Sequence, residues 1–379
     1  MTLPAELLRE AAQRWGTPLF VTDLDSAVAN AVAWRDALPR ALVAYAVKAN
    51  PDPALLSRLA AEGFGFEVVG PVELALARRA GASPDRIVVN GVGQTDADLA
   101  AAAASGALVN AESLGALDTL LATEGRIGLR INPGLEAATH PHLATGSAGS
   151  KFGIALDEMP EALARIRAER RTLDSIGAHI GSAIEDAGIF GRLAQMMVPL
   201  AGKAGARRID MGGGFSGSPA DWAAAVRPHL PDTARLIVEP GRSISADAGW
   251  LLTRVVRVQA RGHLVADAGM TELLRPMLYG ATHPVHLAAP GALVKNRIWT
   301  LAGPICEAGD LLARDLDLGP DAGEGALLAI GRAGAYGASM ASGYNGRLLP
   351  AQAVIERGEL RLSRRRETLE DVVSRDVPG

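Results

Sequence analysis

The chain has 379 residues, of which 48% are hydrophobic and 4% aromatic, and its formal net charge is −4. This length exceeds what one ordinary core needs, so it predicts either a large α/β barrel with an added region or two mid-sized domains. The weak negative charge gives no indication of binding to nucleic acid or to an anionic membrane, and the single cysteine, Cys306, excludes an internal disulfide framework.

The N-terminal residues, MTLPAELLREAAQRWG, alternate charged residues with leucine and alanine and contain no uninterrupted apolar stretch. We therefore expect no signal peptide, and no run elsewhere is long enough to span a bilayer. These features predict a cytoplasmic protein with no membrane or nucleic-acid partner.

Short apolar or β-branched runs alternate with helix-like segments along the first two-thirds of the chain. The runs are Ala41–Lys48, Gly65–Val69, Arg86–Asn90, Ala107–Asn110, Arg126–Ile131, Ser175–Ile180, Arg208–Met211 and Leu236–Glu239. Helices are predicted between them, among others over Ala54–Glu62, Pro71–Ala80, Ala97–Ser105, Glu161–Arg170 and Ile189–Ala204. Such alternation predicts parallel strands, and eight units over about 200 residues fit a (β/α)8 TIM barrel. An open doubly wound sheet is the alternative, but motifs at the ends of many strands favour the barrel.

The alternation stops near Gly249, and the later residues read as strands and turns, with a terminal helix predicted over Thr368–Val373. We therefore predict a barrel domain over residues 24–249. A second, β-rich domain of barrel or sandwich type is predicted over residues 250–379, together with residues 1–23.

Catalytic residues of barrel enzymes lie at the C-terminal ends of the strands, so the predicted strand ends identify candidates. The first strand closes with Lys48 after the apolar run Tyr45-Ala46-Val47. In the barrel mouth, desolvation would lower the pKa of this lysine and suit it to form a Schiff base. A lysine that extends from a strand end to solvent is the alternative interpretation.

The sixth predicted strand ends in Ala178-His179-Ile180. His179 could act as an acid or base, bind a metal or stack on a flat ligand, and a purely structural histidine fits equally well. Because no second histidine or carboxylate lies at ligand spacing, we expect no metal site.

Glycine-containing loops follow the seventh and eighth predicted strands. They contain Gly213-Gly214 and Glu239-Pro-Gly241-Arg242, and barrels often hold a phosphate between these two loops. Tight turns also use glycine, but two such loops together favour a phosphate. The carboxylate of Glu239 is suited to face a pyridinium nitrogen. A lysine for an imine, a carboxylate for a ring nitrogen and glycines for a phosphate together predict pyridoxal 5'-phosphate (PLP).

Longer motifs occur in order along nearly the whole chain. They are GTPLFVTDL, YAVKAN, RINPGLEAATHPHLATG with SKFG, HIGS, MGGG, EPGRS, DAGMTELLRPMLY, GPICEAGD, GAYGASMASGYNGR and RRRET. With these motifs the chain resembles the fold-type III PLP-dependent decarboxylases and, within them, the diaminopimelate decarboxylases. The resemblance implies an alanine racemase-like barrel with a β domain, a homodimer with shared active sites, and decarboxylation of meso-diaminopimelate to L-lysine and CO2 in lysine biosynthesis.

The resemblance also implies the roles of residues around the cofactor. Lys48 would form the Schiff base, His179 would stack on the cofactor ring, and Glu239 would pair with the pyridinium nitrogen. The phosphate or its surroundings would be contacted by Ser182, Gly213, Gly214, Gly241, Arg242 and Tyr336.

For the substrate, the resemblance implies that the β domain of one subunit completes the site of its partner. Cys306, the proton donor, and Glu307, which would bind the distal ammonium group, arrive in this way. The substrate's distal carboxylate and its surroundings would be contacted by Arg242, Arg275, Tyr279 and Tyr336. The segment Asn132–Lys151, rich in Gly, Ala, Thr and His, is predicted to form a lid over the site.

The match departs from the family near the site. Around the HIGS motif, Gly177 replaces the usual second histidine and Ala183 the usual glutamine. Elsewhere Gln94 replaces a lysine, Ser216 a further glycine or proline, and Glu67 an aspartate. These differences leave room for a decarboxylase that acts on a modified or larger diamino acid in a secondary-metabolite or siderophore pathway. A racemase or a non-catalytic PLP-binding homologue is a further alternative. A racemase needs a second base, often tyrosine, where this chain has Cys306, and an inactive homologue should have lost Lys48.

Overall fold

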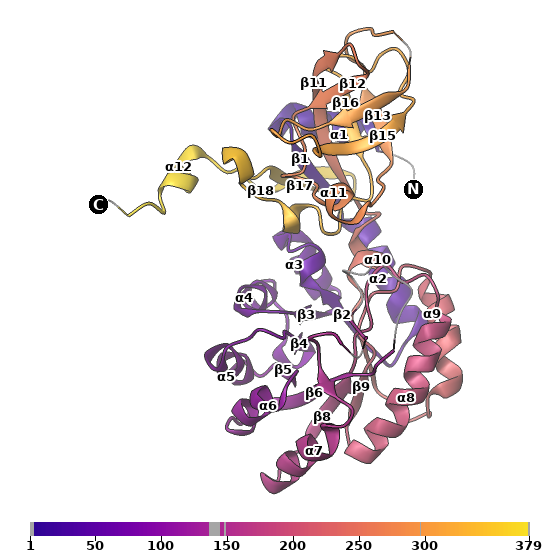
Figure 1. The fold of residues 1–379 in the computed structure, drawn as a ribbon, viewed down its shortest axis with the longest axis vertical. Helices are drawn as coiled ribbons and strands as arrows, with labels where there is room; N and C mark the ends of the chain where they lie inside the picture. The colour runs from indigo at the N-terminus through magenta and orange to yellow at the C-terminus, as the bar shows by residue number, and fades with distance from the viewer. Residues whose placement is uncertain (1–3, 136–144, 148, 296, 378–379) are drawn as a thin grey trace. The chain divides into compact units, whose positions relative to one another are not determined.

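The computed structural model describes residues 4–135, 145–147, 149–295 and 297–377. The chain forms two compact units. One comprises Met1–Ala27, Asp52–Leu55 and Ser245–Gly379, and the other Val28–Pro51 and Leu56–Ile244. Figure 1 shows strands surrounded by helices in the second of these and a strand-rich first unit. No helix among the described residues is long and apolar enough to cross a membrane.

The unit Val28–Pro51 with Leu56–Ile244 contains a closed barrel of eight parallel strands. In chain order they are β2 (Leu42–Ala46), β3 (Gly65–Val68), β4 (Ile87–Val89), β5 (Leu108–Ala111), β6 (Arg126–Asn132), β8 (Leu173–Gly177), β9 (Arg208–Asp210) and β10 (Leu236–Val238). Each pairs with the next, and β10 pairs with β2, which closes the barrel. The short strand β7 (Ile154–Ala155) pairs with β6 outside this ring. The predicted TIM barrel is confirmed.

The barrel helices lie in the connections between strands. They are α2 (Leu24–Ala37), α3 (Pro53–Ala61), α4 (Pro71–Arg79), α5 (Asp96–Ala104), α6 (Leu114–Leu121), α7 (Met159–Ala168), α8 (Gly188–Ala204), α9 (Pro219–Val226) and α10 (Arg242–Ser245). The five helices whose residue ranges were predicted correspond to α3, α4, α5, α7 and α8. Local signals explain the starts of α4 and α5: Pro71 occupies the first turn of α4. Thr95 and Asp98 form a reciprocal capping box that starts α5.

The barrel interior changes from apolar to polar toward the C-terminal ends of its strands. Val88, Leu108 and Ile237 belong to one buried apolar cluster. Two residues further along the chain come Asn110, still within β5, and Asn90 and Glu239, which directly follow β4 and β10; all three are buried. Because side chains two residues apart in a strand point to the same side, these polar groups lie above the apolar cluster, on the side of the C-terminal mouth.

The other unit is built on a mixed sheet. Its strands are β1 (Leu19–Asp23), β11 (Gly249–Gln259), β12 (His263–Ala266), β13 (Val285–Ala289), β14 (Trp299–Ala302), β15 (Leu311–Leu316), β16 (Leu327–Ile330), β17 (Ala351–Glu356) and β18 (Glu359–Arg364). The order is β15-β14-β12-β11-β1-β17-β18, with β16 pairing with β11 and β13. The N-terminal strand β1 lies between β11, to which it is antiparallel, and β17, to which it is parallel. This arrangement confirms the prediction of a β-rich second domain.

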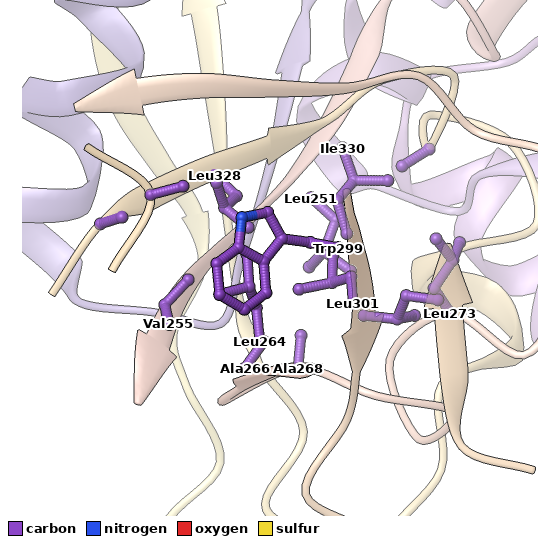
Figure 2. Packing of buried hydrophobic residues seen from close by; sticks show 14 of the residues in the cluster. Leu251, Val255, Leu264, Ala266, Ala268, Leu273, Trp299, Leu301, Leu328 and Ile330 are labelled. Carbon is purple, nitrogen blue, oxygen red and sulfur yellow. The ribbon is translucent and has the colours of Figure 1, made fainter. Parts of the chain in front are cut away.

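Both faces of this sheet are covered, so most residues of β1, β17 and the first half of β11 are buried on both sides. On one face a cluster surrounds Trp299, and Figure 2 shows its indole among Leu251, Val255 and Leu264. On the other face helix α1 (Ala5–Trp15) contributes Leu8 to a second cluster. The unit also contains α11 (Arg275–Tyr279) and α12 (Leu369–Val373). Helix α12 has Thr368 as its N-cap and confirms the predicted terminal helix.

Candidate active site

A cavity of about 480 Å³ opens at the C-terminal ends of the barrel strands. Its lining includes Lys48, Glu67, Asn90, His179 and Glu239. The structure thus brings together three side chains, from positions 48, 179 and 239, that the sequence analysis selected. A larger hollow of about 750 Å³ lies where the strands begin, and its lining contains none of the predicted site residues. Barrel enzymes carry out their chemistry at the C-terminal mouth, so the smaller cavity is the candidate site.

Lys48 lies just beyond the end of its strand. Strand β2 ends at Ala46, and Lys48 occupies a single 3-10 turn, Val47–Ala49. Its Nζ is 2.8 and 2.7 Å from the two carboxylate oxygens of Glu67, whose side chain is buried. The Lys48 side chain keeps 34% of its surface exposed, toward the cavity. Glu67 therefore supplies the opposite charge that a lysine in this largely enclosed position requires.

Glu239 follows β10 directly and is almost fully buried. Its Oε1 accepts a hydrogen bond of 2.7 Å from Nδ2 of Asn90. Burial, followed by the charges of Asp210 and Glu67, raises the pKa of Glu239 well above its ordinary value. Burial likewise raises the pKa of Asp210 to about 6. The site therefore favours a proton on this pair of acids, which suits a carboxyl group that shares a proton with a ring nitrogen.

His179 lies on the loop after β8, which ends at Gly177. Its Nδ1 accepts a hydrogen bond of 3.1 Å from the backbone N–H of Gly213. Burial, followed by the charges of Arg130 and Lys48, lowers the pKa of His179 well below its ordinary value. The ring is therefore neutral, and because Nδ1 is an acceptor the proton is on Nε2. A neutral, flat imidazole at this position suits stacking on a planar ligand.

The glycines of the loop after β9 are required by the packing of the barrel mouth. A β-carbon at Gly213 would lie 2.1 Å from the carbonyl oxygen of Glu239. At Gly214, whose φ is +96°, it would lie 1.9 Å from the carbonyl oxygen of Gly181. Only glycine allows this approach of backbone to backbone, which leaves the loop's own N–H groups close to the mouth.

The remaining predicted residues of this face surround the same loops. Arg242 begins the short helix α10 and donates a hydrogen bond of 3.1 Å to the hydroxyl of Ser182. A β-carbon at Gly241 would lie 3.0 Å from the β-carbons of Ala46 and Ala49, on either side of Lys48. The arginine, the serine hydroxyl and the closely approaching glycine backbone fit a phosphate group. The amine of Lys48 fits an aldehyde, and the protonated acid of Glu239 fits a ring nitrogen. The residues present therefore fit PLP.

Arg275, Tyr279 and Tyr336 lie together in the β-rich unit. The guanidinium of Arg275 is buried, 5.5 Å from the ring centre of Tyr279 and 5.9 Å from that of Tyr336. Tyr336 has a φ of +57°, which is unfavourable for a non-glycine residue and is typical of functional positions. Three of the four predicted substrate-binding residues of this unit thus form one cluster, and the fourth is Glu307.

Cys306 and Glu307 occupy an exposed loop of the same unit. The hydroxyl of Tyr344 donates a hydrogen bond of 2.7 Å to Glu307. Asp310 is buried and accepts hydrogen bonds from the backbone N–H groups of Met270, at 2.6 Å, and Ile305, at 2.8 Å. A buried carboxylate therefore holds the base of the loop while its tip remains accessible.

The sequence analysis missed the polar residues that surround Lys48 and Glu239. Glu67 was noted only as a replacement for aspartate, and Asn90 only as a strand end. The signal that could have identified Asn90 is a polar residue two positions after a buried valine in a predicted strand. No local pattern indicates that it contacts Glu239, because the two residues are separated by 149 positions.

The positions where the chain departs from the family pattern have structural explanations in part. A side chain at Gly177 would contact Asp210, since its β-carbon would lie 2.7 Å from that of Asp210. The side chain of Gln94 lines the cavity and donates a hydrogen bond of 2.7 Å to the carbonyl oxygen of Asn90. Residues 136–144 and 148 of the segment predicted as a lid lie outside the described residues.

Comparisons with known proteins agree with this geometry. Residues 24–246 match the family described as pyridoxal-dependent decarboxylase, pyridoxal binding domain. The diaminopimelate decarboxylase of Deinococcus radiodurans is 42% identical, with 100% of both chains covered. The crystal structure of diaminopimelate decarboxylase from Helicobacter pylori complexed with L-lysine is 32% identical, with a TM-score of 0.92 over 97% of this chain and 98% of that chain. The diaminopimelate decarboxylase of Aquifex aeolicus is 36% identical, with 97% of this chain and 93% of that protein covered.

The family match covers more than half of the chain, and the named relatives align over almost all of it. Together with a barrel mouth that fits PLP, these likenesses show that the chain belongs to the pyridoxal-dependent decarboxylases and, within them, to the diaminopimelate decarboxylase family.

Proposed function

We propose that this protein is a cytoplasmic homodimeric enzyme that converts meso-diaminopimelate to L-lysine and CO2. The observation that carries the proposal is the convergence of Lys48, Glu239 and His179 on one cavity of about 480 Å³. That volume is within the usual range for small-molecule sites. Full-length relatives named diaminopimelate decarboxylases, one of them solved with L-lysine, support the choice of substrate and product.

The barrel domain predicted over residues 24–249 would hold the cofactor. When bound, PLP supplies an electron sink for the electron pair that remains on the substrate after CO2 leaves. Lys48 provides the amine that attaches the cofactor, and Glu67 stabilises the charge of that amine. Glu239 keeps a proton available for the ring nitrogen, since its pKa is raised by burial and by Asp210. His179 supports the ring with a neutral imidazole, which adds no positive charge beside it.

The phosphate would be held by groups on the loops after β8, β9 and β10. Ser182, Gly213, Gly214 and Gly241 offer a hydroxyl and closely approaching backbone, and Arg242 offers a positive charge. Charge-assisted hydrogen bonds from an arginine to a phosphate oxygen are among the stronger contacts available to a protein. Arg242 would also be close enough to the mouth to contact the substrate.

The β-rich domain, predicted over residues 1–23 and 250–379, would supply groups to the substrate. The cluster of Arg275 with Tyr279 and Tyr336 suits the distal carboxylate, because a guanidinium and two phenols can all donate hydrogen bonds to it. Glu307 suits the distal ammonium group, and the Cys306 thiol suits proton transfer to the substrate carbon. Cys306 and Glu307 would arrive from the partner subunit, so that each site is shared between two chains.

The direct test is incubation of the PLP-loaded enzyme with meso-, LL- and DD-diaminopimelate, with lysine and CO2 measured in each reaction. The expected result is equimolar L-lysine and CO2 from the meso isomer. The Lys48→Ala variant should produce neither and should not retain PLP attached to the protein after reduction with borohydride. Absence of CO2 from all three isomers, with PLP bound, would refute the proposed reaction.

Shared sites can be tested by mixing two inactive variants. Lys48→Ala and Cys306→Ala are altered in different domains, so random exchange of subunits should create mixed dimers with one intact site. Activity should then recover to about a quarter of the wild-type value, as expected for a two-fold dimer with half of its dimers mixed. No recovery after demonstrated subunit exchange would mean that each chain supplies its own complete site.

A further inference from the structure

We infer that Asn90 is a positioning residue for the proposed reaction: its amide holds the carboxyl groups of Glu239 and Glu67 in place, and Asn110 and Ser175 hold the amide. The inference rests on the proposed function, because Glu239 and Glu67 serve the ring nitrogen and Lys48 there. It assigns a role to three barrel residues that lie behind the cofactor-contacting side chains.

The hydrogen bonds form a single directed chain. Ser175 Oγ donates to Asn110 Oδ1 at 3.1 Å, and Asn110 Nδ2 donates to Asn90 Oδ1 at 2.9 Å. Asn90 Nδ2 then donates to Glu239 at 2.7 Å and to Glu67 at 3.3 Å. These contacts use both hydrogens of the Asn90 amide nitrogen.

The orientation of the Asn90 amide follows from this chain. If the amide were rotated by 180°, its oxygen would face two carboxyl groups and its NH2 would face the NH2 of Asn110. The contact with Glu67, whose two oxygens already accept from Lys48, would then join two acceptors. The network therefore permits one orientation, in which Asn90 presents only donors to the two acids.

The network crosses the inside of the barrel. Asn90 follows β4 and Glu239 follows β10, and these strands are not neighbours in the barrel. Asn90, Asn110 and Ser175 are 6%, 2% and 0% exposed. At these depths water would not freely replace a lost hydrogen-bond partner. Removing one residue should therefore weaken the remaining hydrogen bonds of the series as well.

Gly128 on β6 makes room for this network. A β-carbon at Gly128 would lie 1.9 Å from Asn110 Oδ1 and 2.6 Å from Ser175 Oγ. Any other residue at this position would displace the Asn110 amide. The packing of the barrel is therefore adapted to the polar chain, as it is to the apolar cluster below it.

A neutral donor suits the charges at this point better than a cation would. The charged or titratable groups that act on Glu239 are Asp210 at the end of β9, Glu67 on β3 and Lys48 after β2. A lysine or arginine in place of Asn90 would favour the ionised form of Glu239 and lower its pKa. The amide instead fixes the position of both acids without adding a charge, so Glu239 can keep a proton for the ring nitrogen.

The test compares Asn90→Ala with wild type in two measurements that do not depend on turnover. One is the PLP dissociation constant of the apoprotein, and the other is the pH at which the visible absorbance of the bound cofactor changes. Asn90→Ala should weaken PLP binding about tenfold, as expected for a lost hydrogen bond to an ionisable group. The absorbance change should move to lower pH, because the acids that stabilise positive charge at the cofactor are no longer held.

Two further variants separate positioning from general damage. Ser175→Ala removes only the far end of the chain and should shift the absorbance change in the same direction by less. Asn30→Ala is the matched control: Asn30 Nδ2 donates to the Ile244 carbonyl oxygen at 2.9 Å in the same unit, away from the cavity lining. It should lower thermal stability without moving the absorbance change.

A double-mutant cycle decides whether Asn90 acts through Glu239. In a Glu239→Gln background, Asn90→Ala should change PLP affinity much less than it does in wild type. Additive effects, or an absorbance change in Asn90→Ala at the same pH as in wild type, would overturn the inference. Because PLP binding is measured without substrate, these results stand apart from whether diaminopimelate is decarboxylated.

Discussion

A methyl group added at Gly213 tests the packing of the barrel mouth most directly. In the structure the β-carbon of Gly213→Ala would lie 2.1 Å from the carbonyl oxygen of Glu239. Carbon–oxygen contacts normally require about 3.3–3.6 Å, so the two groups must separate by about 1.2–1.5 Å. The movement would strain the hydrogen bonds that the same loop makes, from Glu239 N–H to the Gly212 oxygen at 2.8 Å and from Gly213 N–H to His179.

The expected cost follows from the crowding. Overpacking a close contact typically costs about 1–3 kcal/mol. If the cofactor binds only to the undisturbed loop, its dissociation constant should rise roughly 5- to 150-fold. The measurement is a titration of apoprotein with PLP, followed by visible absorbance, together with the thermal midpoint of the apoprotein.

The control is Gly202→Ala, in helix α8. An added β-carbon at Gly202 meets nothing within 4 Å, and its φ is not in the left-handed region. Replacing a helical glycine by alanine should stabilise the protein by about 0.5–1 kcal/mol and leave PLP affinity unchanged. If Gly213→Ala bound PLP as tightly as Gly202→Ala, the loop would not be constrained by Glu239, and the reasoning from this contact would be refuted.

Three other changes test separate parts of the site. Arg275→Leu should raise the KM for diaminopimelate about 10-fold or more through loss of a charge-assisted hydrogen bond, while inhibition by simple diamines should be unaffected; equal losses for both would contradict recognition of a distal carboxylate. Cys306→Ala should reduce CO2 release about 100-fold or more, as expected for loss of a general acid, with little change in PLP affinity; parallel losses of both would indicate a structural role. For His179, burial lowers the pKa well below 6.5, so the unfolded chain takes up a proton before the folded protein does, and stability present above about pH 6.5 is lost as the pH falls below it. In thermal unfolding, His179→Asn should therefore lose less stability than wild type between about pH 7.5 and 5.5, and an identical loss would show that His179 is not held neutral.

Sequence patterns alone predicted the barrel, because each of its elements has a local signature. Alternating short apolar runs and helical segments, with proline at the start of α4 and glycine after helices, were sufficient to recognise parallel strand–helix units. The motifs around Lys48, His179 and Glu239 carry enough chemistry to predict PLP. The sequence also predicted that the last third is rich in strands, because the alternation of strands and helices ends near Gly249.

Boundaries and missed elements show where local signals fail. Lys48 was expected to close a strand, yet β2 ends at Ala46 and the lysine occupies a separate turn. Residues 1–23 were assigned to the β-rich domain, but no pattern within strand β1 indicates which strands it pairs with. Only pairing with β11 and β17, more than 200 residues away, determines its place in the mixed sheet.

What the amino-acid sequence determined by itself is therefore the set of elements and the reactive side chains at their ends. Which of these side chains touch was decided by closure of the barrel, when β10 pairs with β2 and brings Glu239 to the mouth beside Lys48. The contact of Asn90 with Glu239 arises only in the closed ring, whereas that of Lys48 with Glu67 follows from the pairing of β2 with β3. The physical reason is that periodicity encodes which face a residue occupies, whereas the choice of partner across the barrel depends on strand order and register, which no local pattern records.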